Sequence, residues 1–165
     1  MTTFRVDFVQ GKDRPRFTGQ GRTYTTKKTR DAEKAIREAF VAAEIDAHGS
    51  CPEPDDPRAS YSVYIETHRV LPKSRPKKTL LELDTYKPDA DNIAKLVCDA
   101  LNGVAYVDDS QVTDCNVTKY PRLRGLEQEY MQVTVLKNWN GGEHIGYGQE
   151  LLQGVRRRQR SRDGA

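Results

Sequence analysis

The stretch from Lys87 to Val112 constrains this 165-residue chain more than any other part of the sequence. It reads KPDADNIAKLVCDALNGVAYVDDSQV, with five aspartates and two lysines around one predicted helix over residues 91–101. Apolar residues at helical spacing mark the buried face of that helix, and an Asn-Gly pair follows its end. Carboxylates that converge at the ends of a helix repel one another unless a cation lies between them. The stretch therefore predicts a site for a hard divalent cation such as Mg²⁺ or Mn²⁺.

Length and composition fit one polar globular domain. Charged residues make up 31% of the chain and apolar residues 36%, and 165 residues can bury one core but not two. The sequence has no apolar run that could span a bilayer and no signal-peptide pattern, so we expect a cytosolic protein without a membrane partner. Three widely spaced cysteines, Cys51, Cys98 and Cys115, are expected to be reduced and mostly buried.

The hydrophobic periodicity predicts an α+β fold. Strands are expected over residues 3–9, 60–70, 80–83, 112–119 and 129–136. A second helix should begin near Thr29, whose hydroxyl can cap it, after a loop or hairpin around residues 22–25. The turn PRLRGLE should join the last two strands as a hairpin. Residues 1–138 form the expected domain, and the polar, arginine-rich residues 139–165 are expected to be a partly disordered tail.

Basic residues gather in two segments that precede the acidic stretch, although the net charge of the chain is only +3. The expected DNA-binding residues are Lys12, Arg14, Arg16, Arg22, Lys27 and Lys28 in the first segment and Lys73, Arg75, Lys77 and Lys78 in the second. Basic segments beside an acidic centre favour a polyanion that is held by its phosphates. For either cluster alone, solvated surface charge is an equally good interpretation.

The acidic stretch also has the composition of a phosphodiesterase site. Asp91 and Lys95 lie four residues apart on the helix, on the face opposite its apolar stripe, and Asp89 precedes the helix. The pair Asp108–Asp109 follows a turn beyond it. A metal held by such carboxylates lowers the pKa of bound water, and a lysine neutralises charge in the transition state. Taken singly, Asp91 could be an N-cap, Asp108–Asp109 turn residues and Lys95 solvent-facing, but their combination favours catalysis.

The order K-P-D-x-D-N-(I/L)-x-K-x-(L/V)-x-D-A-L-N-G, followed by D-D-(S/A)-Q-V, resembles the signature of the RusA family. This family comprises the crossover junction endodeoxyribonucleases, or Holliday-junction resolvases. The segments GKDRPRFTGQGRTYTTKKTRDAE and LPKSRPKK resemble its basic regions, so the resemblance covers roughly residues 4–137. It implies a single domain with a small mixed β-sheet and two main helices. It also implies a Mg²⁺-dependent homodimer, with Mn²⁺ as a possible substitute, that nicks four-way DNA junctions in pairs.

By this resemblance, the essential metal-binding aspartates are Asp89, Asp91 and Asp109, and Lys95 is the catalytic lysine. Asp108 is the neighbouring acid and a less secure ligand. Two active sites are also what paired nicking requires, and a two-fold dimer supplies them. Two alternatives stay open: a structure-selective branched-DNA binding protein with little or no cleavage, and a nuclease for other branched or flapped DNA. Bacterial and phage sources are equally compatible with the sequence.

Overall fold

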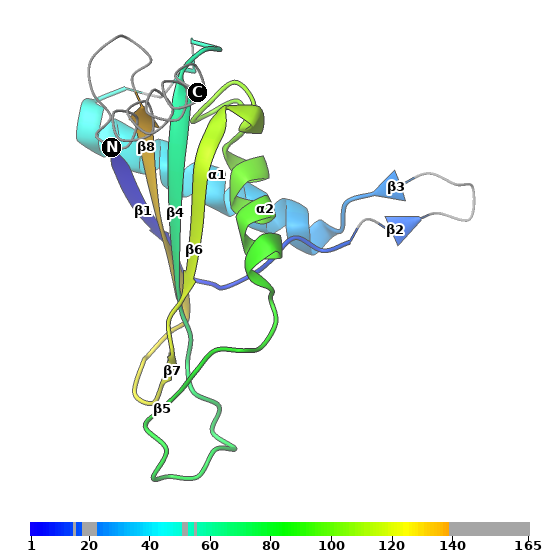
Figure 1. The fold of residues 1–165 in the computed structure, drawn as a ribbon, viewed down its shortest axis with the longest axis vertical. Helices are drawn as coiled ribbons and strands as arrows, with labels where there is room; N and C mark the ends of the chain where they lie inside the picture. The colour runs from blue at the N-terminus through cyan, green and yellow to red at the C-terminus, as the bar shows by residue number, and fades with distance from the viewer. Residues whose placement is uncertain (15, 18–22, 51–52, 55, 139–165) are drawn as a thin grey trace, which may run out of the picture.

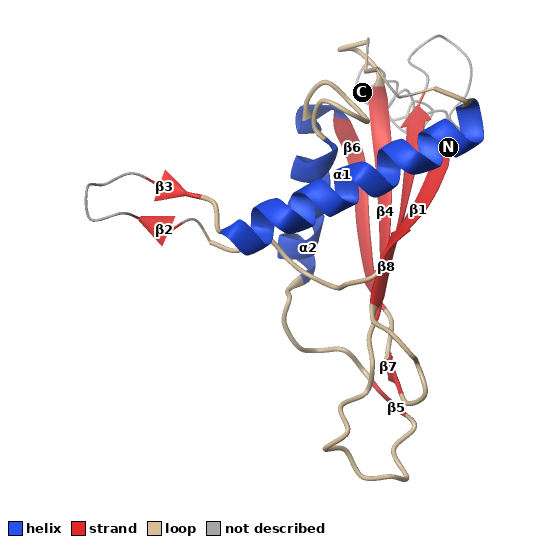
Figure 2. Ribbon diagram, turned by 180° about the vertical axis from the view of Figure 1, so that it is seen from behind, coloured by secondary structure: helices blue, strands red, loops and turns tan. Residues whose placement is uncertain are grey.

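The computed structural model describes residues 1–14, 16–17, 23–50, 53–54 and 56–138. The predicted tail and Arg22 lie outside these described residues, so the domain boundary at residue 138 stays a prediction. The fold is α+β, as expected: two long helices cover one face of a mixed four-stranded sheet (Figure 1; Figure 2). No helix in the described part of the chain is long and apolar enough to cross a membrane.

The main sheet has the strand order β1-β8-β4-β6. Its strands are β1 (Thr2–Val6), β4 (Ser60–His68), β6 (Val112–Lys119) and β8 (Tyr130–Asn138). β8 pairs antiparallel with both β1 and β4, whereas β6 pairs parallel with β4. The predicted hairpin between the last two strands is therefore wrong, because β4 lies between β6 and β8. The Pro and Gly residues of PRLRGLE correctly signal a turn, but a local turn signal cannot identify the partner of the strand that follows it.

The helices are α1 (Lys27–His48) and α2 (Ala90–Leu101). The predicted cap at Thr29 is wrong: the N-cap is Thr26, whose side chain accepts a hydrogen bond from the Thr29 amide at 3.2 Å. Thr29 itself is buried inside the first turn. Either threonine suits a cap by type, and tertiary burial decides between them. α1 ends at Gly49, whose φ of 73° is the left-handed conformation that glycine adopts without strain.

One hydrophobic core lies between the sheet and the two helices. The inward residues of β1, β4 and β8 meet the apolar stripes of α1 and α2, and the two helices also pack against each other. The fully buried side chains of this core include Ile36, Ile65, Ile93, Leu96, Leu101, Tyr106, Met131 and Val133. Since α2 is anchored by this stripe, its opposite face is turned to solvent at a fixed orientation.

Two small antiparallel ladders project from the main body (Figure 1). One pairs β2 (Arg16–Phe17) with β3 (Thr23–Tyr24), as the predicted loop or hairpin allowed. The other pairs β5 (Leu81–Glu82) with β7 (Arg122–Leu123), at the end of the sheet where β4 finishes and β8 begins. The predicted strand over residues 80–83 is thus only two residues long.

Candidate active site and nucleic-acid interface

The N-terminal end of α2 presents two carboxylates and a lysine to solvent. Asp89 is the N-cap residue of α2, yet its side chain makes no capping hydrogen bond. Asp91 lies in the first turn, and its Oδ2 is 3.8 Å from Nζ of Lys95, with both side chains 66% exposed. The alternative that Asp91 serves only as an N-cap is therefore wrong. Both carboxylates are accessible to a ligand at the positive end of the helix dipole.

The two residues of the second acidic pair differ: Asp108 has a structural role, whereas Asp109 is accessible to solvent. Asp108 is the N-cap of the short 3₁₀ helix η1 (Asp109–Gln111) and accepts a hydrogen bond from the Ser110 amide at 2.9 Å. The Gln111 side chain completes a capping box by accepting from the Asp108 amide at 3.2 Å. Hydrogen bonds from Ser110 lower the pKa of Asp108. The turn-residue interpretation is thus right for Asp108, whereas Asp109 is exposed in the first turn of η1.

The three predicted metal ligands are not gathered into one cluster. In the part of the chain that the structure describes, no group of three or more Asp, Glu, His or Cys side chains could hold a metal ion. Asp89 and Asp91 suit a hard cation by chemistry, because they offer exposed oxygen donors at one helix end. Asp109 would have to lie closer to Asp89 and Asp91 for all three to bind one ion, so this set of metal ligands stays a prediction.

A cleft of about 690 Å³ lies beside Asp89. Its lining includes Lys12, Arg14, Lys28, Arg69, Lys87, Asp89 and Asn92. The N-terminal segment runs very close to α2 here, because an added Cβ at Gly11 would lie 2.8 Å from Cβ of Pro88. The five cations of the lining outnumber its two acids, Asp13 and Asp89, and such a cleft suits a phosphate backbone.

Sequence reasoning missed Arg69 and Lys87 as members of this cleft. Lys87 opens the acidic stretch and could have been found by its position beside Asp89. Arg69 directly follows β4, twenty residues earlier than Asp89 along the chain, and no sequence pattern connects them. A hydrogen bond from Arg69 to the Lys87 carbonyl and the close approach of the N-terminal segment to α2 bring the residues together.

Two predicted DNA-binding residues are already paired with acids. Nζ of Lys12 contacts the Asp99 carboxylate and lies 3.3 Å from Glu33 Oε1, so Lys12 links its loop to both long helices. Burial lowers the pKa of Lys12, but these two acids outweigh it and raise the pKa. Arg75 donates two hydrogen bonds to Glu82, at 2.7 and 2.8 Å. These contacts make both residues part of the folded framework.

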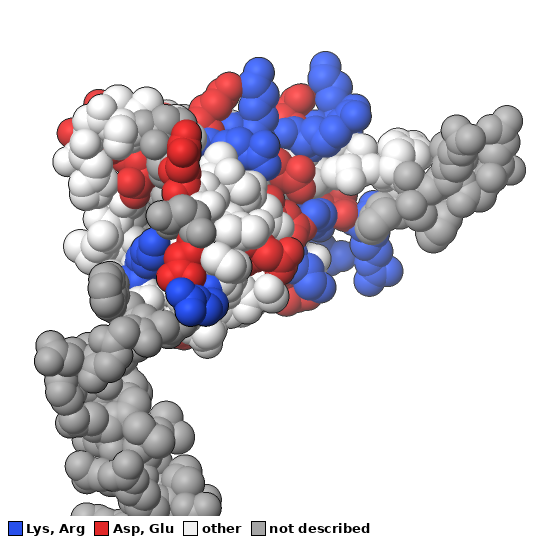
Figure 3. Space-filling view, turned by 90° about the horizontal axis from the view of Figure 1, so that it is seen from above, with Lys and Arg blue, Asp and Glu red and all other residues white. Residues whose placement is uncertain are grey.

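The other predicted basic residues are placed differently. Arg14 and Lys28 line the cleft, and Lys27 is exposed at the start of α1. Exposed side chains in the loop before β5 belong to Lys73, Lys77 and Lys78. The backbone of Arg16 lies in β2. Seen from one end of the molecule, Lys and Arg side chains gather near the base of the β2–β3 ladder, interspersed with acids (Figure 3).

A buried carboxylate, Asp84, lies where the β5–β7 ladder joins the main sheet. Its side chain is 0% exposed, and Oδ1 accepts a hydrogen bond from Arg122 Nε at 2.8 Å. Arg69 NH1 lies 3.3 Å from the same oxygen, and Lys119 Nζ lies 4.0 Å from Oδ2. Cations on several sides compensate a buried carboxylate for the water it has lost. The network therefore ties the ladder to the ends of β4 and β6.

Two cations of this network also hold the backbone that leads to Asp89. Lys119 Nζ donates to the carbonyl of Pro88 at 3.0 Å and to the carbonyl of Tyr86. Arg69 NH1 donates to the carbonyl of Lys87 at 2.9 Å. These bonds fix the turn before α2 and hence the position of Asp89.

A pair of cysteines lies between α2 and β6. The Sγ atoms of Cys98 and Cys115 are 4.0 Å apart, and both residues are free thiols. The hydrogen bond between them lowers the pKa of Cys115 to about 7 and raises the pKa of Cys98. The expectation of mostly buried thiols is wrong for Cys115, which is exposed, because β6 is an edge strand. Cys51 lies outside the described residues.

We expect Cys115 to be alkylated by iodoacetamide already at neutral pH, because the thiolate is the reactive form. Its rate should be half-maximal near pH 7, the value to which the hydrogen bond from Cys98 lowers its pKa. Peptide mass spectrometry over a series of pH values measures this rate for each cysteine. The Cys98→Ala variant should move the midpoint toward ~8.5, the ordinary value for cysteine. A midpoint near that value in the unaltered protein would contradict the assignment.

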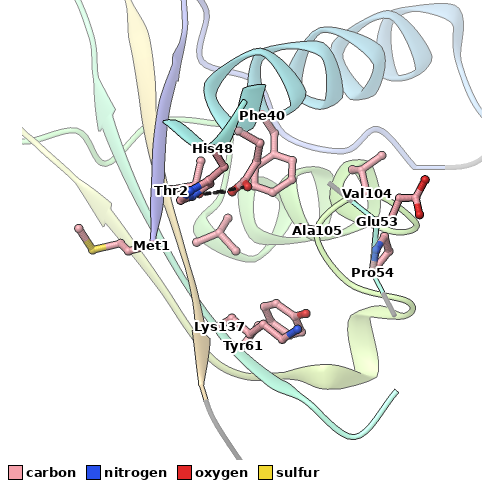
Figure 4. A pocket seen from close by; sticks show the side chains of 12 residues that line it. Met1, Thr2, Phe40, His48, Glu53, Pro54, Tyr61, Val104, Ala105 and Lys137 are labelled. Carbon is pink, nitrogen blue, oxygen red and sulfur yellow. Dashed lines mark hydrogen bonds and ion pairs between the residues drawn. The ribbon is translucent and has the colours of Figure 1, made fainter. Parts of the chain in front are cut away.

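A second cavity, of about 290 Å³, lies at the other end of the sheet (Figure 4). Thr2, Phe40, Tyr61 and Lys137 are among its lining residues. Glu44 at its rim accepts a hydrogen bond from Thr2 and lies 3.8 Å from Nε2 of His48. None of the predicted site residues lines this cavity, so it is separate from the end of α2 that carries Asp89 and Asp91.

The chain is a small α+β protein that presents acids and a lysine at one end of a helix, beside a basic cleft. Proteins that cut nucleic acids combine these features. A family model described as Endodeoxyribonuclease RusA matches residues 8–127. The chain therefore belongs to the RusA family of endodeoxyribonucleases, which confirms the resemblance drawn from its motifs.

A curated relative is the uncharacterized protein YqaN of Bacillus subtilis (strain 168). It is 43% identical to this chain over 81 residues, which cover 41% of this chain and 56% of the relative. The chain thus matches little more than half the length of that relative.

Proposed function

We propose that this protein resolves Holliday junctions as a divalent-metal-dependent endonuclease. The observation that carries the proposal is the pairing of Asp91 with Lys95 at the exposed end of α2, directly beside the basic cleft that Asp89 borders. Membership of an endodeoxyribonuclease family supports cleavage of DNA as the reaction. The choice of a four-way junction as substrate rests on what the family motif implies.

In this proposal, Asp89, Asp91 and Asp109 hold Mg²⁺, for which Mn²⁺ can substitute. The bound ion supplies Lewis-acid polarisation of the scissile phosphate and a more acidic water molecule. Lys95 stands one turn from Asp91, where its ammonium group can neutralise charge on the phosphate in the transition state. Asp108 contributes by holding η1, and thereby the backbone of Asp109, through its capping box.

The basic cleft is proposed to hold the DNA backbone. Arg14, Lys28 and Lys87 line it beside Asp89, so a phosphate bound there would lie next to the acidic end of α2. Lys73, Lys77 and Lys78 would extend the contact along the loop before β5. The basic residues 139–165 are proposed to add phosphate contacts that do not depend on base sequence. Paired cuts require two such sites, and we propose that a homodimer supplies them.

We expect Mg²⁺ to support symmetric nicking of a synthetic four-way junction, and EDTA to abolish it. A linear duplex of the same sequence should remain uncut, because only the junction offers two related strands to a two-fold dimer. Denaturing gel electrophoresis of end-labelled strands measures both reactions. The binding of the junction in EDTA should persist, since the basic cleft does not require the metal.

The alternatives give different results in the same assay. Binding of the junction without cleavage in either metal would indicate a structure-selective binding protein. Equal cutting of junction and duplex would indicate an unselective nuclease, and preferential cutting of a flap would indicate another branched substrate. Any of these outcomes would overturn the resolvase proposal.

A further inference from the structure

A pair of thiols bridges the two segments that carry the proposed metal ligands. Cys98 lies on α2, beyond Asp91 in the same helix, and Cys115 lies on β6, the strand that follows Asp109. Their Sγ atoms are 4.0 Å apart, and both thiols are free. α2 packs against β6 (Figure 1). A bond between the two sulfurs would therefore connect the segment of Asp91 directly to the segment of Asp109.

The fold holds the backbones of both cysteines, so their contact follows from the packing of α2 on β6. The carbonyl of Cys98 accepts a hydrogen bond from the hydroxyl of Tyr106 at 2.9 Å, and Tyr106 is fully buried. Cys115 is the Cα partner of Val63, a fully buried residue of β4. Cys98 is half-buried and Cys115 is exposed. The thiols thus meet at a fixed place where a small oxidant in solution can reach one of them.

The two thiols differ as a reacting cysteine differs from a resolving one. The hydrogen bond from Cys98 lowers the pKa of Cys115 to about 7, although burial and Asp114 act in the opposite direction. The same contact, together with burial, raises the pKa of Cys98. Redox-sensing cysteines are accessible thiolates that lie beside a second cysteine. Cys115 has these properties, and Cys98 is placed to resolve its oxidised form.

We propose that Cys98 and Cys115 are a redox modification site, at which a peroxide converts the two thiols to a disulfide that ties α2 to β6 and slows DNA cleavage. The Cys115 thiolate attacks one peroxide oxygen and becomes a sulfenic acid, while the O–O bond breaks and the other oxygen leaves and takes up a proton. The Cys98 sulfur then attacks the Cys115 sulfur, so that the S–S bond forms, the S–O bond breaks and the hydroxide leaves as water with the proton of Cys98. In total the thiols lose two hydrogen atoms, and hydrogen peroxide is reduced to two water molecules. Exchange with a reducing thiol reverses the reaction.

The effect on cleavage rests on the proposed function, because it requires that Asp89, Asp91 and Asp109 bind one ion. Within the described part of the chain these carboxylates do not form one cluster, so α2 and η1 would have to shift relative to each other. A disulfide between α2 and β6 opposes that shift, since η1 leads directly into β6. The described lining of the basic cleft contains neither cysteine, so binding of DNA should persist.

A soft metal ion fits this pair less well than a disulfide. A structural zinc ion is held by four nitrogen or sulfur ligands. The residues that the structure describes offer no group of three or more Asp, Glu, His or Cys side chains for a metal, and the cysteine pair supplies only two. Two adjacent thiols are sufficient for a disulfide.

The test is mass spectrometry of the full-length protein after treatment with hydrogen peroxide and alkylation with N-ethylmaleimide. Trypsin leaves both cysteines in one peptide, residues 96–119, because no lysine or arginine lies between Lys95 and Lys119. We expect the oxidised peptide to lack two hydrogen atoms and to carry no alkyl group, and dithiothreitol to restore alkylation of both thiols. Single-turnover nicking of the junction should fall roughly tenfold or more in the oxidised protein, because small displacements of reacting groups have effects of this size. The nicking rate should recover after reduction.

Three variants separate the thiols. Cys51→Ser is the matched control and should form the same disulfide. Cys115→Ser should nick at the unaltered rate and should not respond to peroxide; since Cys115 is exposed, this variant should fold normally, as circular dichroism will verify. In Cys98→Ser, oxidation should stop at the sulfenic acid of Cys115, which dimedone captures.

Each outcome decides the proposal. A folded protein that forms no disulfide between Cys98 and Cys115 overturns it, whether or not the protein cuts DNA. A disulfide that leaves the nicking rate unchanged, or a response to peroxide that persists in Cys115→Ser, overturns the control of cleavage. A reversible disulfide in a protein that fails to nick junctions even when reduced supports the modification site. In that case the proposed function is wrong.

Discussion

We expect Asp91→Asn to abolish DNA cleavage while the protein stays folded and still binds the junction. Asp91 is 66% exposed and is not the N-cap of α2, so an amide of the same shape should change stability by about 1 kcal/mol or less. The variant loses the negative charge that the proposed metal site requires, and it also loses the partner of Lys95. We expect the nicking rate to fall roughly 100-fold or more, as when other transition-state stabilising groups are removed. Single-turnover cleavage of a labelled four-way junction measures the effect.

Asp46→Asn is the matched control, because Asp46 is an exposed acid near the end of α1 that does not belong to the proposed site. It should cut at the unaltered rate. If Asp91→Asn also cuts at that rate, the assignment of Asp91 to the metal site is wrong. If Asp91→Asn fails to fold, the residue has a structural role that its exposure does not predict.

The largest loss of stability is expected for Asp84→Ala. Asp84 is fully buried and shared by Arg122, Arg69 and Lys119, so its removal leaves cations with little access to water and no counter-charge. Breaking a buried network in this way costs about 3–5 kcal/mol. The melting temperature should fall by roughly 10 °C, since about 2–4 °C corresponds to 1 kcal/mol at this chain length. Urea denaturation at constant pH measures the free energy of unfolding.

Arg75→Ala is the comparison, because it breaks an ion pair of the same ladder that is about one-third exposed. Partly exposed pairs contribute about 1 kcal/mol or less, so this variant should unfold close to the unaltered protein. Equal losses for Asp84→Ala and Arg75→Ala would show that burial of Asp84 is not what stabilises the ladder. Junction cleavage by Asp84→Ala, measured well below its melting temperature, should also fall because Lys119 and Arg69 hold the turn before Asp89.

The chain order and type of the main elements could be predicted from the sequence. Alternation of apolar residues indicated β1 and β4, and helical spacing indicated α2 to within one residue of its start. These are short-range patterns, since a strand or helix faces the core with a period fixed by its own geometry. The pairing of strands is a long-range property, so the partner of β8 could not be predicted from the turn that precedes it.

The sequence by itself determined the chemistry of this protein: the carboxylates and lysine of α2, the acidic pair at η1 and the basic segments. These residues lie within one stretch of 26 residues or in continuous basic segments, so residue type and spacing are sufficient to identify them. The tertiary structure alone decided which of them share a site. In the structure Asp108 belongs to a capping box, and Lys12 forms an ion pair with Asp99. Arg69 donates a hydrogen bond to the turn before Asp89.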